Sequence, residues 1–285
     1  MSELLTQPGK AYFPIDYRAV VFSFATETAQ ALVDVGYTSN MGFVSRRAAL
    51  SGPSHGYFAG GSLPASQTLA KVNFVTNLGQ SVTGFTRRHP RSLGASNAYR
   101  GYVFGGTTTN EDKQGVLVDK VDFATDAIAV AGTLLTPDGN YQSELWSQVV
   151  QNHHSAFLRS GPTADRPNLW SEYDLFSDSH AALGAAPSEN HFNLGAAISG
   201  PTHGYVPIHP TQGLEKFSYA SKTASVSRLT FPTGVSMVAA ASGPQKGYWV
   251  DSSGRTRAIS YMTDVEIAVS TALQDTVGTA IVSSI

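Results

Sequence analysis

The chain has 285 residues, of which 41% are apolar and 14% are charged, and this is enough to bury one large core or two small ones. Its 19 basic and 21 acidic residues give a net charge of −2, which argues against a general nucleic-acid or acidic-membrane binder with its strong basic excess. The sequence contains no cysteine, which excludes disulfides, thiolate catalysis and Cys-ligated metal sites.

The first ten residues, MSELLTQPGK, contain an acidic residue, a glutamine and a proline where a secretory signal needs a long apolar stretch. We therefore expect no signal peptide. No apolar run in the chain approaches the roughly 20 residues of a membrane-spanning helix, so we expect no membrane insertion.

A motif that we name the Gly-Tyr motif recurs along the chain. In chain order it reads TQPGKAYFPID at 6–16, SGPSHGYFAGG at 51–61, SNAYRGYVFGG at 96–106, a weaker QNHHSAFLRSG at 151–161, SGPTHGYVPIH at 199–209 and SGPQKGYWVDS at 242–252. Every copy has an aromatic residue at its seventh position: Tyr12, Tyr57, Tyr102, Phe157, Tyr205 and Tyr248.

A second motif, the Phe-Ala-Thr motif, alternates with the first. It reads FSFATET around Phe24, VNFVTNL around Phe74, VDFATDA around Phe123, a degraded YDLFSDS around Leu175, FSYASKT around Tyr219 and ISYMTDV around Tyr261. The mean period is about 47 residues, which lies within the range of propeller blades. Asp122 and Asp126 in the third copy are best explained as turn formers.

Each repeat unit is predicted to form four short strands. In residues 69–106, the segments LAKVNFVT, QSVTGF, RSLGASN and GYVFGG are separated by turn residues. Segments of small residues, such as RAALS and VAAAS, suit the crowded innermost strand of a propeller. The sequence therefore predicts an all-β fold, a six-bladed β-propeller of four-stranded blades, as a single domain over residues 1–285.

The two ends of the chain are predicted to share one blade. The C-terminal segment TVGTAIVSSI resembles an innermost strand but lacks the Gly-Tyr strand that should follow it. The N-terminal GKAYFPID supplies such a strand, so the last blade is expected to be closed by strands from both termini, which removes open sheet edges.

The two motifs resemble kelch-like propeller repeats. GYFAGG at 56–61, GYVFGG at 101–106 and DKVDFATDA at 119–127 are similar to the GYFAGG and FATDT repeats of proteins from phages, especially cyanophages, and from some of their hosts. The resemblance covers nearly the whole chain. It implies a six-bladed propeller and a structural role in a virion or tail.

The residue before each Gly-Tyr pair forms a column with five basic or titratable members, which we name the basic column: Lys10, His55, Arg100, Ser155, His203 and Lys246. Six-fold repetition would place these groups in a ring at one mouth of the central channel, where they could bind an anion, an acidic glycan or an acidic segment of a partner. The alternative is that an exposed turn simply carries polar residues.

Two further groups are candidates for partner or sugar contacts. The first comprises the basic loop residues Arg46, Arg47, Arg87, Arg88, His89 and Arg91, which could form one patch or be solvated and locally paired. The second comprises aromatic residues near the atypical Gly-Tyr copy: Tyr141, Trp146, Trp170 and Tyr173. Aromatic residues of this kind stack on sugars but more often pack in cores.

No catalytic motif is recognisable: G-x-S-x-G, P-loop, HExxH and the sialidase-type S-x-D-x-G-x-T-W patterns are all missing. The adjacent His153 and His154 cannot easily face one metal ion, so we expect no metal site. Because the catalytic motifs are missing, we also expect no enzyme and no cofactor. The leading hypothesis is a structural or adhesion protein, virion-associated or extracellular, whose partners are other proteins of a larger assembly or a host-surface glycan. A soluble lectin-like carbohydrate-binding propeller is the alternative, and a glycan-processing enzyme ranks third.

Overall fold

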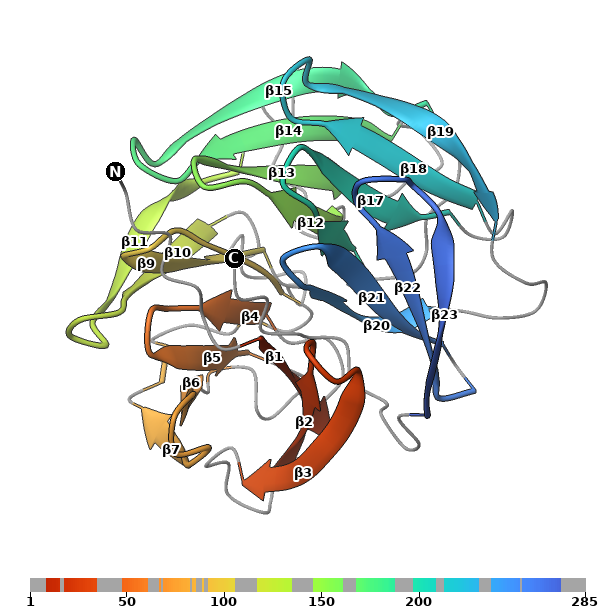
Figure 1. Ribbon diagram of the computed structural model, residues 1–285. Coiled ribbons are helices and arrows are strands. Elements are labelled where there is room, and N and C mark those ends of the chain that lie inside the picture. Colours follow the sequence, from red (N-terminus) through yellow and green to blue (C-terminus); the bar gives the residue numbers. More distant parts are fainter. Residues whose placement is uncertain are drawn as a thin grey trace, which may run out of the picture.

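The computed structural model describes residues 9–15, 18–34, 48–60, 67, 69–82, 84–85, 89, 92–105, 117–134, 146–160, 168–187, 197–208, 213–230, 237–251 and 253–272. These residues form 23 strands and no α-helix. The strands make six antiparallel sheets that surround a central axis as blades, so the predicted six-bladed β-propeller is confirmed (Figure 1).

The blades follow one another in chain order. Blade 1 contains β1 (Lys10–Ile15), β2 (Arg18–Ser23) and β3 (Thr28–Asp34). Blade 2 contains β4 (Ala48–Ser51), β5 (His55–Ala59), β6 (Leu69–Asn73) and β7 (Gly79–Val82). Blade 3 contains β8 (Leu93–Ser96), β9 (Arg100–Phe104), β10 (Leu117–Asp122) and β11 (Ile128–Thr133).

The other three blades repeat this order. Blade 4 contains β12 (Trp146–Gln151), β13 (Ser155–Ser160), β14 (Leu169–Asp174) and β15 (Ser179–Ala185). Blade 5 contains β16 (Ile198–Ser199), β17 (His203–Pro207), β18 (Gly213–Ser218) and β19 (Thr223–Thr230). Blade 6 contains β20 (Met237–Ser242), β21 (Lys246–Asp251), β22 (Arg255–Ser260) and β23 (Glu266–Ala272).

The first strand of each four-stranded blade lies innermost, because these strands contact their counterparts in the next blade: β4 meets β8, β8 meets β12, β12 meets β16 and β16 meets β20. Their small residues allow this approach. A Cβ atom on Gly94 would lie 2.4 Å from the backbone oxygen of Ala49 in blade 2. The predicted crowding of the innermost strands is therefore confirmed.

The ends of the innermost strands are joined by a run of hydrogen bonds. The backbone N–H of Ser51 donates to Ser96 Oγ at 2.9 Å, and that of Ser96 donates to Gln151 Oε1 at 2.7 Å. The run continues from Gln151 N to Ser199 Oγ at 3.0 Å and from Ser199 N to Ser242 Oγ at 2.8 Å. Each innermost strand from blade 2 to blade 6 is thereby linked to its neighbour in one rotational sense.

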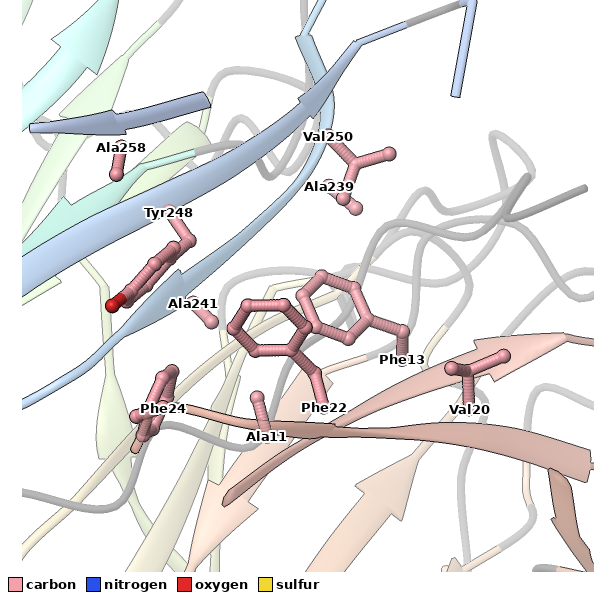
Figure 2. Close-up of a cluster of buried hydrophobic side chains, with 10 residues drawn as sticks. All are labelled: Ala11, Phe13, Val20, Phe22, Phe24, Ala239, Ala241, Tyr248, Val250 and Ala258. Carbon is pink, nitrogen blue, oxygen red and sulfur yellow. The ribbon is translucent and has the colours of Figure 1, made fainter. Parts of the chain in front are cut away.

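Apolar clusters fill all six seams between neighbouring blades. The seam of blades 6 and 1 contains Phe13, Phe22 and Phe24 from blade 1 and Tyr248 and Val250 from blade 6, and Figure 2 shows their side chains facing one another across the seam. The opposite side of blade 1 packs against blade 2 in a separate cluster. The ring is therefore closed by packing on both sides of blade 1.

The predicted closing strand falls on residues 276–285, which lie outside the described residues. Blade 1 consequently shows three strands rather than four among the described residues. Its β1 is the Gly-Tyr strand that the sequence assigned to the N-terminus, and it pairs with β2 from Lys10 opposite Ser23 to Ile15 opposite Arg18.

Candidate functional site

One end of the propeller is built from tight turns, and we name it the hairpin face. Because the strands of a blade are antiparallel, the turn between its first two strands and the turn between its last two strands lie at the same end. The first kind covers 52–54, 97–99, 152–154, 200–202 and 243–245. The second kind is the turn of the Phe-Ala-Thr motif, present in all six blades.

On this face, a hydrogen bond joins the Phe-Ala-Thr turn of each blade to the residue that precedes the basic column. The N–H of Phe24 donates to the carbonyl of Gly9 at 2.6 Å, and that of Phe74 donates to the carbonyl of Ser54 at 3.0 Å. The same bond recurs in the other four blades, where the acceptors are Tyr99, His154, Thr202 and Gln245. These backbone bonds make the hairpin face a rigid surface.

The fourth residue of each Phe-Ala-Thr turn, counted from Phe24 and its equivalents, adopts a left-handed conformation. Its φ angle lies between 53° and 58° in Glu27, Asn77, Asp126, Asp178, Lys222 and Asp264. In blade 3, Asp122 Oδ1 accepts hydrogen bonds from the N–H groups of Ala124 and Thr125, both at 3.1 Å. The prediction that Asp122 and Asp126 form the turn is confirmed.

This left-handed residue also binds the preceding blade, in an arrangement that we name the clasp. Asp126 of blade 3 accepts a hydrogen bond from Tyr57 of blade 2 at 2.9 Å and pairs with Lys71. Asp264 of blade 6 likewise accepts from Tyr205 of blade 5 at 2.6 Å and pairs with Lys216. Burial alone would raise the pKa of Asp264, but the bonds from Lys216 and Tyr205 outweigh it, so its pKa lies below the ordinary value.

The clasp between blades 4 and 5 has the opposite polarity. Here the strand residue is Glu172 and the turn residue is Lys222, and Nζ of Lys222 lies 2.6 Å from Oε2 of Glu172. The other carboxylate oxygen of Glu172 accepts a 2.7 Å hydrogen bond from Ser155. Phe157 replaces the tyrosine of the motif, so no phenol takes part in this clasp.

The basic column lies at the start of the second strand of each blade, one strand outward from the innermost strand. His55, Arg100 and His203 are placed opposite Asn73, Asp122 and Ser218 of the third strand. Lys10 and Lys246 occupy the same register in blades 1 and 6. All these residues therefore share the hairpin face, with one member in each blade.

Several column residues are already engaged with the protein. Lys246 pairs with Glu27 at 2.7 Å and Ser155 donates to Glu172. Nδ1 of His55 lies 2.8 Å from Ser54 Oγ, and Nδ1 of His203 lies 2.8 Å from Thr202 Oγ1. Burial, reinforced by the nearby Lys71 and Lys216 respectively, lowers the pKa of both histidines. At neutral pH the column thus carries less positive charge than its sequence indicates.

The seam of blades 6 and 1 opens into a cleft of about 590 Å³ on the hairpin face, which we name the seam cleft. Its lining residues are Gly9, Phe24, Ala25, Thr26, Glu27, Pro244, Gln245, Lys246 and Tyr248. Glu27 Oε1 accepts hydrogen bonds from Lys246 Nζ at 2.7 Å and from Tyr248 Oη at 3.0 Å. The bond from Lys246 is the main cause of the lowered pKa of Glu27.

The hairpin face also exposes apolar side chains. Met262 is 92% exposed and Val75 is 84% exposed, and both occupy the second position of a Phe-Ala-Thr turn. Among the described residues, the other large exposed apolar or aromatic residues of this face are Leu78, Tyr99, Phe176 and Val265. Phe176 lies 5.3 Å from the ring of His154 in blade 4. The sequence signal for this exposed ring is the degraded copy YDLFSDS, which has Phe at the second position of the turn.

Two of the aromatic residues predicted for partner or sugar contacts, Trp170 and Tyr173, are buried in the described structure. Trp170 is 2% exposed and Tyr173 is fully buried, so both side chains pack in seams rather than at the surface. Trp170 contributes to the seam of blades 4 and 5, where its Nε1 donates to the buried Glu215 at 2.5 Å. Trp146 begins β12, and Tyr141 lies outside the described residues.

The predicted basic patch is only partly within the described residues. Arg46, Arg47, Arg87, Arg88 and Arg91 lie outside them. His89 is fully buried, with Nε2 at 2.5 Å from Asp119 Oδ2 and Nδ1 at 3.0 Å from the carbonyl of Gly105. The prediction that His89 belongs to an exposed patch is therefore wrong, because both ring nitrogens are hydrogen-bonded to buried groups of Asp119 and Gly105.

The described residues contain no group of three or more His, Asp or Glu side chains placed to bind a metal ion. In the same part of the chain, no helix has the length and apolar character needed to cross a membrane.

The repeated blades and their closed ring define the class of protein: a six-bladed β-propeller with one rigid, turn-built face. In comparisons with known proteins, no family model matches the chain and no curated protein is significantly similar to it.

Proposed function

We propose that this propeller is a non-enzymatic structural or adhesion protein of a phage virion or tail, where its hairpin face contacts another protein or the host surface. The observation that carries the proposal is the display of exposed apolar side chains on rigid turns. Met262 and Val75 are almost fully exposed, although the backbone beneath them is fixed by the hydrogen bonds between the two turns of their blades.

The charged residues of this face are largely paired with one another, which favours contact with a partner. The clasps pair acidic residues with lysines at four of the six seams through Asp126, Asp178, Glu172 and Asp264, and Glu27 pairs with Lys246 at a fifth. A surface with paired charges and exposed apolar groups loses little on desolvation, and it resembles the centre of protein interfaces more than a solvated surface. The repeat resemblance supplies the virion or extracellular setting of the proposal.

The test begins with the location of the protein. Density-gradient fractionation of the source material, with the chain followed by mass spectrometry, should show co-migration with a large particle. Recovery of the chain only in the soluble fraction would contradict the virion role.

A matched pair of variants then tests the face itself. The variant Val75→Ser, Phe176→Ser, Met262→Ser removes apolar groups from the hairpin face and should reduce incorporation into the particle. The control variant Val130→Ser, Val226→Ser removes apolar groups that are 59% and 56% exposed from the outer strands β11 and β19, and it should incorporate normally. Equal incorporation of both variants would place the contact on another surface.

A lectin-like propeller is the second candidate, and the seam cleft favours it. A concave site of about 590 Å³ with apolar walls and a few polar groups has the dimensions of a small-molecule site. A glycan array probed with a multivalent form of the chain distinguishes this candidate, since a lectin should retain a defined set of glycans.

A further inference from the structure

The seam cleft has a local cause in the sequence. Gly9 lines it, and the equivalent position of the other five blades carries a side chain: Ser54, Tyr99, His154, Thr202 and Gln245. A Cβ atom on Gly9 would lie 3.4 Å from Phe24 Cβ, which also lines the cleft. The absence of a side chain at residue 9, together with the small Ala25, therefore leaves space that the equivalent side chains would reduce.

The polar groups of the cleft differ from those of the other clasps. Only in this seam does a member of the basic column, Lys246, supply the lysine of the described charge pairs, and only here is the turn residue a glutamate, Glu27. The side chains of Lys246 and Glu27 are 31% and 29% exposed, so a ligand in the cleft can reach both. Gln245 and Thr26 add an amide and a hydroxyl to the same lining.

These groups select a ligand by its chemistry. The carboxylate of Glu27 repels an anion and the ammonium group of Lys246 repels a cation. Because the two charges cancel, the pair has no net charge. A hydroxyl group can donate to the carboxylate and accept from the ammonium or amide group. Phe24, Ala25 and Pro244 offer an apolar wall to the C–H face of a ring. A sugar ring combines hydroxyl groups with such an apolar face.

We propose that the seam cleft binds an uncharged pyranose residue of a glycan, with Glu27 and Lys246 hydrogen-bonded to its hydroxyl groups and its apolar face against Phe24 and Pro244. The proposal rests on the proposed adhesion function, because it specifies the host-surface glycan as one kind of contact. It differs from an anion site on the basic column in both location and ligand charge.

The test uses the full chain and defined probes. Saturation-transfer NMR is recorded with methyl glycosides of glucose, galactose and mannose, and with N-acetylneuraminic acid as the acidic comparison. The unmodified protein should bind at least one neutral glycoside, and calorimetric titration should then give its affinity. Preference for N-acetylneuraminic acid would overturn the proposed ligand class.

Three variants place the site. Gly9→Gln introduces into the cleft the side chain that blade 6 carries at the equivalent position, and it should abolish binding. Glu27→Gln should weaken binding at least about tenfold, as expected for loss of a hydrogen bond to a charged group. Asp126→Asn changes the same turn position at a seam without this cleft and should leave the affinity unchanged. Thermal melting of each variant verifies folding.

The outcomes separate this proposal from the proposed function. If neutral glycosides bind all variants equally, the site lies elsewhere and the proposal is overturned, while a glycan-binding function remains. If no glycoside binds although the chain co-migrates with particles, the proposal is overturned and the structural function stands. Loss of binding in Gly9→Gln and Glu27→Gln, but not in Asp126→Asn, supports the proposal.

Discussion

Glu172 and Lys222 form the one clasp of reversed polarity among the described residues. The equivalent strand residues Lys71, Lys120 and Lys216 all pair with aspartates. A change of Glu172 to the usual lysine would face Lys222 with a like charge, whereas a second change of Lys222 to aspartate would restore an attractive pair. The exchange of both residues is therefore expected to conserve the interaction that either single change destroys.

A double-mutant cycle measures this interaction. We expect Glu172→Lys and Lys222→Asp each to lower the free energy of unfolding by about 1 kcal/mol or less, because partly exposed ion pairs contribute about 0.2–1 kcal/mol. The double variant should recover most of the loss in urea unfolding. Additive losses in the double variant would show that the pair contributes nothing.

Gly94 tests the crowding of the innermost strands. A methyl group at this position would lie 2.4 Å from the carbonyl oxygen and 2.8 Å from the nitrogen of Ala49, and neither backbone atom can move away easily. We expect Gly94→Ala to lower the free energy of unfolding by about 1–3 kcal/mol, as for other overpacked cores. Gly9→Ala is the control, since its new Cβ would make only an ordinary contact with Phe24. Equal unfolding midpoints would argue against close packing of β4 and β8.

The sequence predicts single turn residues well but pairs across a seam poorly. Asp122 and Asp126 were recognisable as turn formers because their partners lie within four residues. The clasp of Asp126 with Lys71 joins residues 55 positions apart, and only the geometry of neighbouring blades brings them together. For the same reason, the pairing of Lys246 with Glu27 could not be inferred from the basic column.

At the scale of elements, the turns of the Phe-Ala-Thr motif make stability depend on pH. The pKa of Glu27, Asp174 and Asp264 is lowered in the folded protein. Their stabilising effect is complete above the unfolded values of 4.5 for Glu and 3.8 for Asp, and it is lost as the pH falls through the lower folded values.

The histidines of the column act in the same direction at higher pH. Burial lowers the pKa of His55 and His203 below the ordinary 6.5, so protonation opposes folding once the pH falls below that value. We therefore expect the melting temperature to be constant above about pH 7, to begin to fall below about pH 6.5 and to fall more steeply below about pH 4.5.

Calorimetric melts between pH 8 and pH 3 test this dependence. The variant Glu27→Gln should be less stable than the unmodified chain at pH 7 and should lose less stability between pH 5 and pH 3. If this variant lost as much stability between pH 5 and pH 3 as the unmodified chain, Glu27 would not be stabilised as an anion in the folded chain.

The individual strands follow closely from the repeat pattern. The segments predicted from residues 69–106 appear as β6 to β9, with the small segment innermost. The atypical blade 4 shows the limit of the pattern. Trp170 and Tyr173 lie three residues apart on β14, and they pack in the seams on opposite sides of blade 4. The irregular spacing does not show which side of the blade each ring covers, so neither could be assigned to a seam from the sequence.

At the scale of the whole molecule, β1 holds two seams at once. Its Ala11 and Phe13 belong to the cluster shared with blade 6, and its Tyr12 belongs to the cluster shared with blade 2 and donates to Asn77 at 2.7 Å. Removal of residues 1–16 should therefore abolish the cooperative unfolding transition. The hydroxyl-deletion variant Tyr12→Phe, which keeps both seams, should retain that transition. Unchanged melting of the truncated chain would show that β1 does not close the ring.

The blade number and the ring were predictable because the period and the aromatic positions repeat along the chain. The closing contribution of residues 276–285 stays a prediction. The cleft and the reversed clasp were not predictable, because each arises from a departure from the repeat.

The reversed clasp also bears on how such a chain can change in evolution. Genes with tandem repeats are prone to unequal recombination, which exchanges or duplicates whole units. A copy of blade 3 in place of blade 4 would set a lysine against Lys222, and a copy of blade 3 in place of blade 5 would set an aspartate against Glu172. Replacement of either blade alone would thus set like charges against each other at this seam, whereas joint transfer of blades 4 and 5 would keep the attractive pair.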